Sequence, residues 1–364
     1  MPSQSDAVLA LAAIAGELPA AALRRLIVSE DYRYKVIADL KAKKLIKLFA
    51  RDGVKGYRLT AKAKELLLTT NPARFSFFLT GNADTNKLHT EVTRRLRLHR
   101  NAEAVITLLH AGAALFPGEK PALFGVPPAA VSQPPAAAFY FSREMKNVGE
   151  EHLKIRSSRA SGLLLTDSEL LLVYNTGANL MKWEYQTELR CKVLMTTRFC
   201  QDAGTILYPG GQARALMLGA GMDTALTLLD STGGYKRQFF RLDGAFERFY
   251  FAPNTPGGET QVKILCASEI REALRQLLLS DLQPPQPGLR VEHDALRGDG
   301  VPVLLAYEFD MERLRRFRDS LQMFGGFGLV VCFDFQQAVL EEYLAGVAEF
   351  QAVSLEKVRQ RFGI

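Results

Sequence analysis

The stretch from residue 45 to residue 60 restricts the fold of this 364-residue chain more than any other. LIKLFAR and GYRLT alternate between apolar and polar residues, which is typical of strands with one buried face. Asp52-Gly53 lies between them and supplies the positive φ that a tight hairpin turn needs. The stretch therefore predicts a two-stranded β-hairpin.

Helical patterns precede this hairpin. Residues 6–17 predict a first helix with apolar side chains inward. Residues 19–28 predict a second helix with Pro19 in its first turn, where the missing N–H of proline costs nothing. Ser29 is a typical N-cap, and the acidic residues after it suit the positive end of a third helix over about residues 30–44.

Positive charge is concentrated in this part of the chain. Residues 1–70 contain thirteen basic and seven acidic residues, a net charge of +6, against +7 for the whole sequence. Such an asymmetry indicates a polyanionic partner for the segment. A solvated helix face without a partner is the alternative that charge alone leaves open.

Three helices, a basic hairpin and a further helix capped by Thr60, in this order, are the elements of a winged helix-turn-helix. The run KGYRLTAKAKELL, residues 55–67, resembles the wing and the following helix of many bacterial winged-helix proteins. We therefore expect residues 1–75 to be a domain that binds double-stranded DNA with its third helix in the major groove. An unrelated helical bundle with a hairpin is the alternative fold.

The expected DNA contacts lie on the third helix and on the hairpin. Tyr32, Arg33 and Lys35 are nearest the N-terminus of the third helix and are expected to read base edges. Any one of the basic residues is explained equally well as a free surface charge. The residues expected to contact phosphates or the minor groove are Lys41, Lys43, Lys44, Arg51, Lys55 and Arg58.

Residues 76–138 separate this domain from the rest of the chain. A basic helix is expected from Asn86 to Asn101, where it would extend the DNA contact, join a dimer or pack on the next domain. Residues 117–138 are rich in proline and alanine and predict an irregular linker. The arginines expected around the apolar side of the helix are Arg94, Arg95, Arg97 and Arg100.

Residues 139–364 predict an α/β region, either one domain or two domains that divide near residue 200 or 285. Its strands are nearly continuous apolar runs that alternate with helical segments, so we expect a mostly parallel sheet covered on both faces. The expected strands are residues 161–167, 169–175, 214–221, 246–253, 261–267, 301–309 and 328–335.

Motifs that carry chemistry are scarce. The sequence contains no Walker loop, no HExxH and no CxxC motif, and its five histidines do not have metal-ligand spacing. Gly219-Ala220-Gly221 lacks the third glycine of a dinucleotide-binding turn, so we interpret it as a tight strand-to-helix connection. We therefore expect no cofactor.

Two of the expected strands end in Phe-Asp, at Asp310 and Asp334, directly before a helix. Together with Glu308 these carboxylates would lie where open α/β sheets bind ligands, and a magnesium-dependent nuclease would use them. Asp167 and Glu169 are alternative ligands for such a metal. Because aspartate is also a favoured N-cap and no lysine follows at ExK spacing, we favour a capping role and expect no metal site.

The order of a winged helix, a basic helix and an α/β domain resembles the replication-relaxation proteins of plasmids and integrative elements. The resemblance implies a restriction-endonuclease-like fold for the α/β region, with residues 159–188 in its core. Ala160-Ser161-Gly162 stands where that fold has an acidic Pro-Asp-Gly element, and Val173-Tyr174-Asn175 stands where it has a carboxylate pair. The resemblance therefore implies a degenerate nuclease fold without its metal ligands.

These features together predict a multidomain α+β protein of a mobile element that binds double-stranded DNA sequence-specifically, in replication, transfer or transcriptional control. One winged helix reads few base pairs, so we expect a homodimer, with replication or conjugation proteins as further candidate partners. The four dispersed cysteines suit a reducing cytoplasm, and no stretch has the roughly 18 apolar residues that a membrane span needs. The alternatives are a metal-dependent nuclease and a winged-helix module for protein interaction.

Overall fold

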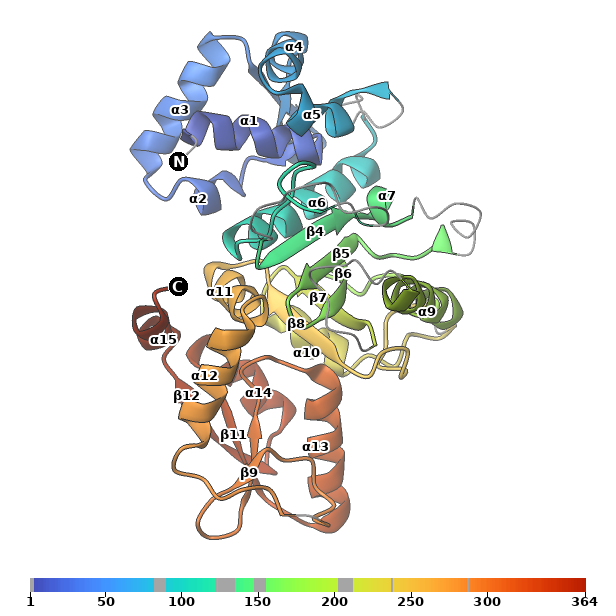
Figure 1. Ribbon diagram of the computed structural model, residues 1–364, viewed down its shortest axis with the longest axis vertical. Helices are drawn as coiled ribbons and strands as arrows, with labels where there is room; N and C mark the ends of the chain where they lie inside the picture. The colour runs from blue at the N-terminus through green and yellow to red at the C-terminus, as the bar shows by residue number, and fades with distance from the viewer. Residues whose placement is uncertain are drawn as a thin grey trace. The chain divides into compact units, whose positions relative to one another are not determined.

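A computed structural model describes residues 3–81, 90–121, 123, 135–146, 155–201, 212–236, 238–286 and 288–364. These residues form an α+β protein with three sheets, in which parallel and antiparallel pairs both occur (Figure 1). The chain divides into two compact units. Unit 1 consists of Met1–His110 with Ala114–Ala122 and Pro128–Pro135, and unit 2 contains the remainder. No helix in the described ranges is both long enough and apolar enough to cross a membrane.

Two helices of unit 1 begin at the side-chain caps that the sequence predicts. The Ser29 hydroxyl accepts a hydrogen bond from the Tyr32 N–H, and the Thr60 hydroxyl accepts one from the Ala63 N–H, which confirms the expected starts of the third helix and of the helix after the hairpin. The helices are α1 (Gln4–Ala15), α2 (Leu23–Leu26), α3 (Glu30–Ala42), α4 (Ala61–Thr70), α5 (Pro72–Leu79) and α6 (Val92–His110).

The sheet of unit 1 contains the expected hairpin and one strand that was not expected. β2 (Ile46–Arg51) and β3 (Val54–Leu59) pair antiparallel around Asp52 and Gly53, which both have positive φ. β1 (Leu18–Pro19) pairs with the other edge of β3. The prediction that Pro19 begins a helix is therefore wrong: it lies in an edge strand, where the missing N–H is equally harmless, and the second helix shrinks to α2.

Helix α6 belongs to unit 1 and packs on α1, β1 and β3. Residues 86–89 of the expected basic helix lie outside the described residues, and the described part begins at Val92. Arg95 was expected on its outer side but is completely buried. Arg95 is buried because its guanidinium pairs with the buried carboxylate of Glu17, which follows α1.

Unit 2 contains two sheets of mixed direction, so the prediction of one mostly parallel sheet is wrong. In the five-stranded sheet, β4, β5 and β6 are antiparallel, whereas β6, β7 and β8 are parallel. In the four-stranded sheet, β9 alone is antiparallel to its neighbour. In spatial order the strands are β4 (Ala137–Phe141), β5 (Gly162–Thr166), β6 (Leu170–Gly177), β7 (Arg214–Gly219) and β8 (Phe249–Pro253), and then β12 (Ala348–Val353), β11 (Gly328–Phe333), β10 (Pro302–Leu305) and β9 (Ala295–Leu296).

Two of the expected strands of unit 2 differ in the structure. Residues 261–267 were expected to be a strand but lie mostly in a helix that Thr255 caps and Pro256 starts. The strand expected over residues 301–309 ends at Leu305, and a turn follows in which the Phe309 N–H donates to the Ala306 carbonyl at 2.8 Å and Phe309 has a φ of 54°. The helices are α7 (Ser142–Met145), α9 (Tyr185–Gln201), α10 (Asp223–Leu229), α11 (Pro256–Leu265), α12 (Ser268–Leu279), α13 (Met311–Phe324), α14 (Gln337–Tyr343) and α15 (Leu355–Phe362).

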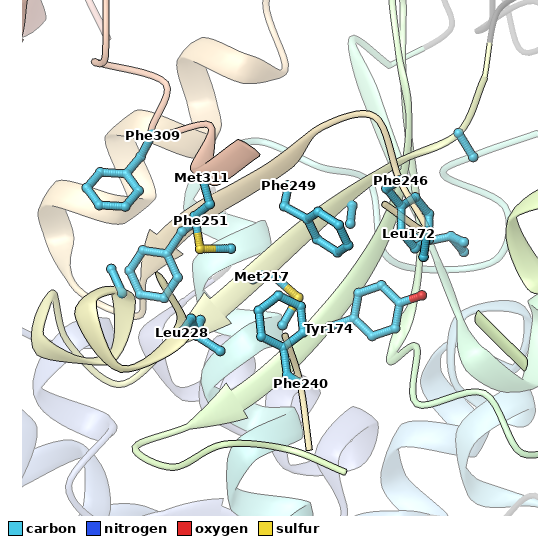
Figure 2. Packing of buried hydrophobic residues seen from close by; sticks show 14 of the residues in the cluster. Leu172, Tyr174, Met217, Leu228, Phe240, Phe246, Phe249, Phe251, Phe309 and Met311 are labelled. Atoms are coloured by element: carbon cyan, nitrogen blue, oxygen red, sulfur yellow. The ribbon is translucent and has the colours of Figure 1, made fainter. Parts of the chain in front are cut away.

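One hydrophobic core joins the two sheets of unit 2 (Figure 2). The rings of Phe251 on β8 and Phe309 lie 5.7 Å apart, and the Phe251 N–H donates to the Phe309 carbonyl at 3.0 Å. Helices α9, α10, α13 and α14 contribute to this core, whereas a second core on the other face of the four-stranded sheet includes residues of α12 and α15. The contacts hold Ala136–Ile364 in one unit.

Candidate nucleic-acid interface

Helix α3 has one face in the core of unit 1 and one in solvent. Val36, Ile37 and Leu40 are buried. At 100° per residue, the side chains of Tyr34 and Lys35 project away from this buried face. Tyr34 is 79% exposed and Tyr32 is 49% exposed, so two tyrosines and Lys35 follow the exposed Glu30 and Asp31 in the first half of the helix.

The solvent side of α3 and the hairpin carries lysines that are not neutralised. Lys35, Lys44, Lys47 and Lys55 are exposed, and within the described ranges none of them has a carboxylate partner. The other expected contacts are partly engaged: Lys43 pairs with Asp39 at 2.7 Å, Arg51 pairs with Asp52 at 3.3 Å, and Lys41 lies over the ring of Tyr57 at 5.3 Å.

Two arginines expected at this surface have structural roles. The Arg33 guanidinium donates to the Ile27 carbonyl at 3.0 Å, and its side chain is only 22% exposed. Arg58 is buried and donates to Oε2 of Glu17 at 2.5 Å through Nη2. The prediction that Arg58 contacts DNA is therefore wrong, since its charge is used inside unit 1.

Glu17 is the centre of a buried cluster of polar side chains that holds the hairpin, and the other members of this Glu17 cluster are Arg58, Arg95 and His99. Its carboxylate accepts hydrogen bonds from Arg58 and Arg95 and lies 2.8 Å from Nε2 of His99. Burial alone would raise the pKa of Glu17, but hydrogen bonds from His99, Arg95 and Arg58 outweigh this effect and lower the pKa to about 2. The carboxylate is therefore ionised at neutral pH.

Arg95 extends this group to the backbone of the hairpin. Its guanidinium donates to the carbonyls of Phe49 and Val54, both at 2.9 Å, and to the carbonyl of Arg51 at 3.1 Å. Both strands and the turn region of the hairpin are thus bonded to one residue of α6. This geometry fixes the position of the hairpin on the helices of unit 1 and orients its exposed lysines.

Two exposed residues of this surface, Tyr34 and Lys47, were not among the expected contacts. The helical period of the buried α3 residues was sufficient to place Tyr34 outward, because it lies about a third of a turn from them. The alternation of apolar and polar residues at the start of β2 was sufficient to place Lys47 outward, because it follows buried Ile46.

The carboxylates that the nuclease alternative would need as metal ligands in unit 2 have other partners in the structure. Glu308 accepts from Nη2 of Arg271 at 2.8 Å. Asp310 caps α13 by accepting from the Glu312 and Arg313 N–H groups at 3.1 and 3.4 Å, which confirms its capping role. Asp334 accepts hydrogen bonds from the backbone N–H groups of Phe335 at 2.8 Å and Leu355 at 3.3 Å. The described residues contain no cluster of three histidine, cysteine or acidic side chains that is suited to a metal ion.

The alternative ligands Asp167 and Glu169 are also engaged. Glu169 is buried and pairs with Arg214 and, at 2.6 Å, with Arg271, while Tyr250 donates to it at 3.2 Å. Asp167 accepts from the Ser268 hydroxyl. This network connects the five-stranded sheet to α12 and Glu308, and its carboxylates are neutralised by arginine.

Comparison with known proteins finds no relative: no family model matches the chain, and neither a curated protein nor a solved structure is significantly similar to it.

Proposed function

We propose that unit 1 is a winged helix-turn-helix that binds double-stranded DNA sequence-specifically, with α3 in the major groove and the β2–β3 hairpin as the wing. The observation that carries this proposal is the set of exposed lysines on α3, on the hairpin and in the turn between them that have no carboxylate partner in the described residues, namely Lys35, Lys44, Lys47 and Lys55. Unneutralised cations on a helix and an adjacent hairpin are suited to a helical polyanion.

The distribution of charge on α3 favours base contacts from the residues that follow Glu30 and Asp31. Glu30 and Asp31 stabilise its N-terminus through the helix dipole but would repel a phosphate there. Tyr32, Tyr34 and Lys35 would then read base edges, while Lys44, Lys47 and Lys55 would bind phosphates. The proposed site therefore differs from the expected one by the gain of Tyr34 and Lys47 and by the loss of the two arginines with structural roles, Arg33 and Arg58. It also leaves out the expected cations that contact other side chains, namely Lys41, Lys43 and Arg51.

Unit 2 would support DNA binding and would not catalyse a reaction. By its resemblance to the replication-relaxation proteins, the chain would act in the replication, transfer or transcriptional control of a mobile element, as a cytoplasmic homodimer. The five-stranded sheet would then be a degenerate restriction-endonuclease-like fold. A nuclease is disfavoured, because the carboxylates that it would need are bound to arginines or to backbone N–H groups.

Selection from a pool of random duplexes tests the DNA-binding proposal. The full chain should enrich one sequence, in two symmetric half-sites if it is a dimer, and binding should weaken as salt rises from about 50 to 200 mM. A Lys35→Ala/Lys55→Ala variant should lose most of its affinity. A Lys357→Ala/Arg361→Ala variant, which changes two exposed cations of α15, is the matched control and should bind normally.

An Arg33→Ala variant would not separate an effect on folding from an effect on DNA binding, because the hydrogen bond from Arg33 to Ile27 connects α2 to α3. Failure of the full chain to bind any duplex at the lowest salt would contradict the proposal. The winged helix would then be interpreted as a surface for protein contacts.

A further inference from the structure

A cleft of about 650 Å³ lies in unit 2, away from the carboxylates discussed above. Three segments contribute to its lining. Before β5 these residues are Ser157 and Arg159, at the start of α9 they are Lys182, Trp183, Glu184, Tyr185, Thr187 and Glu188, and between α10 and β8 they are Lys236, Gln238, Arg241 and Asp243. Trp183 is 5% exposed and anchors the wall, because its indole N–H donates to Asp243 at 2.8 Å and its ring packs on Phe240. The cleft is therefore held by a packed core.

Four cations line this cleft, and the described part of the chain provides none of them with a carboxylate partner. They are Arg159, Lys182, Lys236 and Arg241. Lining cations that are left unpaired in a concave site raise the local concentration of anions. The cleft therefore favours an anionic ligand, provided that its own carboxylates are neutralised or engaged.

The three acidic residues of the lining are engaged by donors of the protein. Glu188 is buried and accepts hydrogen bonds from the Ser158 hydroxyl, the Tyr174 hydroxyl and the Arg159 N–H, each at 2.8 Å. Glu184 accepts from the Thr187 N–H at 2.8 Å and so caps the first turn of α9. Asp243 accepts from Trp183 and from the Ala245 N–H. Each carboxylate is thus used for structure, whereas the cations are available to a ligand.

Exposed aromatic side chains accompany these cations. Tyr185 lines the cleft and is 36% exposed. Tyr235 is fully exposed beside Lys236, and Phe239 is 40% exposed and forms a β-bridge with Lys182. Cations that bind phosphates, combined with aromatic rings on which bases stack, are the features of surfaces that bind unpaired strands. A duplex keeps its bases stacked inside and would not use the rings.

We propose that this cleft is a second nucleic-acid site, which binds an unpaired DNA strand. The phosphates would lie on Arg159, Lys182, Lys236 and Arg241, and one or more bases would stack on Tyr185, Tyr235 or Phe239. The site lies in unit 2 and does not depend on the duplex site proposed for unit 1. A protein with both sites would hold duplex and separated strand together, as the opening of a duplex at a bound sequence requires.

The test measures the binding of a short, labelled oligothymidine to the full chain by fluorescence anisotropy. Lys182→Ala/Arg241→Ala should weaken this binding by about tenfold or more, and Tyr235→Ala should weaken it by about fivefold or more through lost stacking. Lys357→Ala/Arg361→Ala removes the same charge from α15 and should have little effect. Arg241 is half-buried and the other replaced side chains are exposed, so thermal unfolding should change little.

A crossed pair of variants separates this proposal from the one for unit 1. Lys35→Ala/Lys55→Ala should lose duplex binding and keep oligothymidine binding, whereas Lys182→Ala/Arg241→Ala should do the reverse. If oligothymidine binding depends on Lys35 and Lys55 instead, the strand binds unit 1 and the cleft proposal is overturned. It is also overturned if polyglutamate of equal charge competes as well as the oligonucleotide, since the cleft would then bind acidic protein.

Discussion

Nη2 of Arg95 lies 2.6 Å from Oε1 of Glu17, and neither side chain has any exposed surface. Glu17 follows α1, whereas Arg95 lies in the first turn of α6, so this ion pair joins the first and last helices of unit 1. Arg58 on β3 pairs with the same carboxylate. One carboxylate is therefore the shared partner of two buried guanidinium groups, and the hairpin that we propose as the wing depends on it.

Replacing Glu17 by glutamine should destabilise unit 1 strongly. Removal of one partner from a buried ion pair typically costs about 3–5 kcal/mol, because the remaining charge stays buried without compensation. Denaturant unfolding of the full chain at neutral pH measures this loss. The matched control is Glu30→Gln, which changes an exposed carboxylate with 87% side-chain exposure and should alter the unfolding free energy by less than about 1 kcal/mol.

The same variant should change the acid response of the protein. Because the pKa of Glu17 falls from 4.5 to about 2 on folding, its stabilising effect is complete above about pH 4.5 and is lost as the pH falls toward 2. The difference in unfolding free energy between the natural chain and Glu17→Gln should therefore shrink over this range. A difference that stays constant would mean that the charge of Glu17 is not what stabilises unit 1.

Gly56→Ala should disrupt the buried cluster of Glu17, Arg58, Arg95 and His99 by a steric clash. An added Cβ would lie 2.4 Å from Oε1 of Glu17 and 2.8 Å from Nε2 of His99, and Gly56 is held between β1 and β2 by pairing on both sides. We expect a loss of several degrees in thermal stability and weaker duplex binding. Gly298→Ala is the control, since its Cβ would meet no atom within 4 Å. Unchanged stability of Gly56→Ala would contradict the packing described here.

Elements with local signals could be predicted from the sequence. Ser29 and Thr60 show where helices begin because a capping hydroxyl acts on backbone within three residues, and Asp52-Gly53 determines its own turn. Pro19 has no such unique signal. It suits the first turn of a helix and an edge strand equally, and its pairing with Gly56 decides between them.

The candidate DNA surface could be predicted in part for the same reason. Periodicity is enough to separate the solvent face of α3 from its core face, so Lys35 could be placed on the solvent face and Tyr34 could have been. The burial of Arg58 and Arg95 could not be inferred from local pattern, because their partner Glu17 lies 41 and 78 residues away in the sequence. A basic residue in an amphipathic strand or helix is expected outward unless a distant acid is known to lie beneath it.

Asp310→Asn should alter the pH dependence of unit 2 while preserving the cap of α13, since asparagine also accepts the two backbone hydrogen bonds. Burial raises the pKa of Asp310 from 3.8 to about 6, against the attraction of Arg248 and Arg313. Between these two pKa values Asp310 is ionised in the unfolded chain but still protonated in the folded protein. The free energy of unfolding of the natural protein should therefore fall as the pH rises from about 4 to 6. The variant should lack this loss, which amounts to at most about 3 kcal/mol.

Urea unfolding at several pH values between 4 and 7 provides the measurement for Asp310. Asp281→Asn, at an exposed position, is the control and should follow the natural protein at every pH. If Asp310→Asn also follows it, the buried carboxyl does not titrate in this range.

Lys55→Ala should reduce the salt dependence of duplex binding. If the lysine binds a phosphate, its removal should lower the slope of log affinity against log salt by about one and weaken all sequences to a similar extent. Lys35→Ala should instead also reduce the preference for the selected sequence, because Lys35 lies on the solvent face of α3 and is proposed to read a base edge. Lys357→Ala, in unit 2, should leave slope and preference unchanged. Equal slopes for Lys55→Ala and the natural chain would mean that Lys55 binds no phosphate, and would leave Lys47 as the hairpin lysine in the proposed DNA contact.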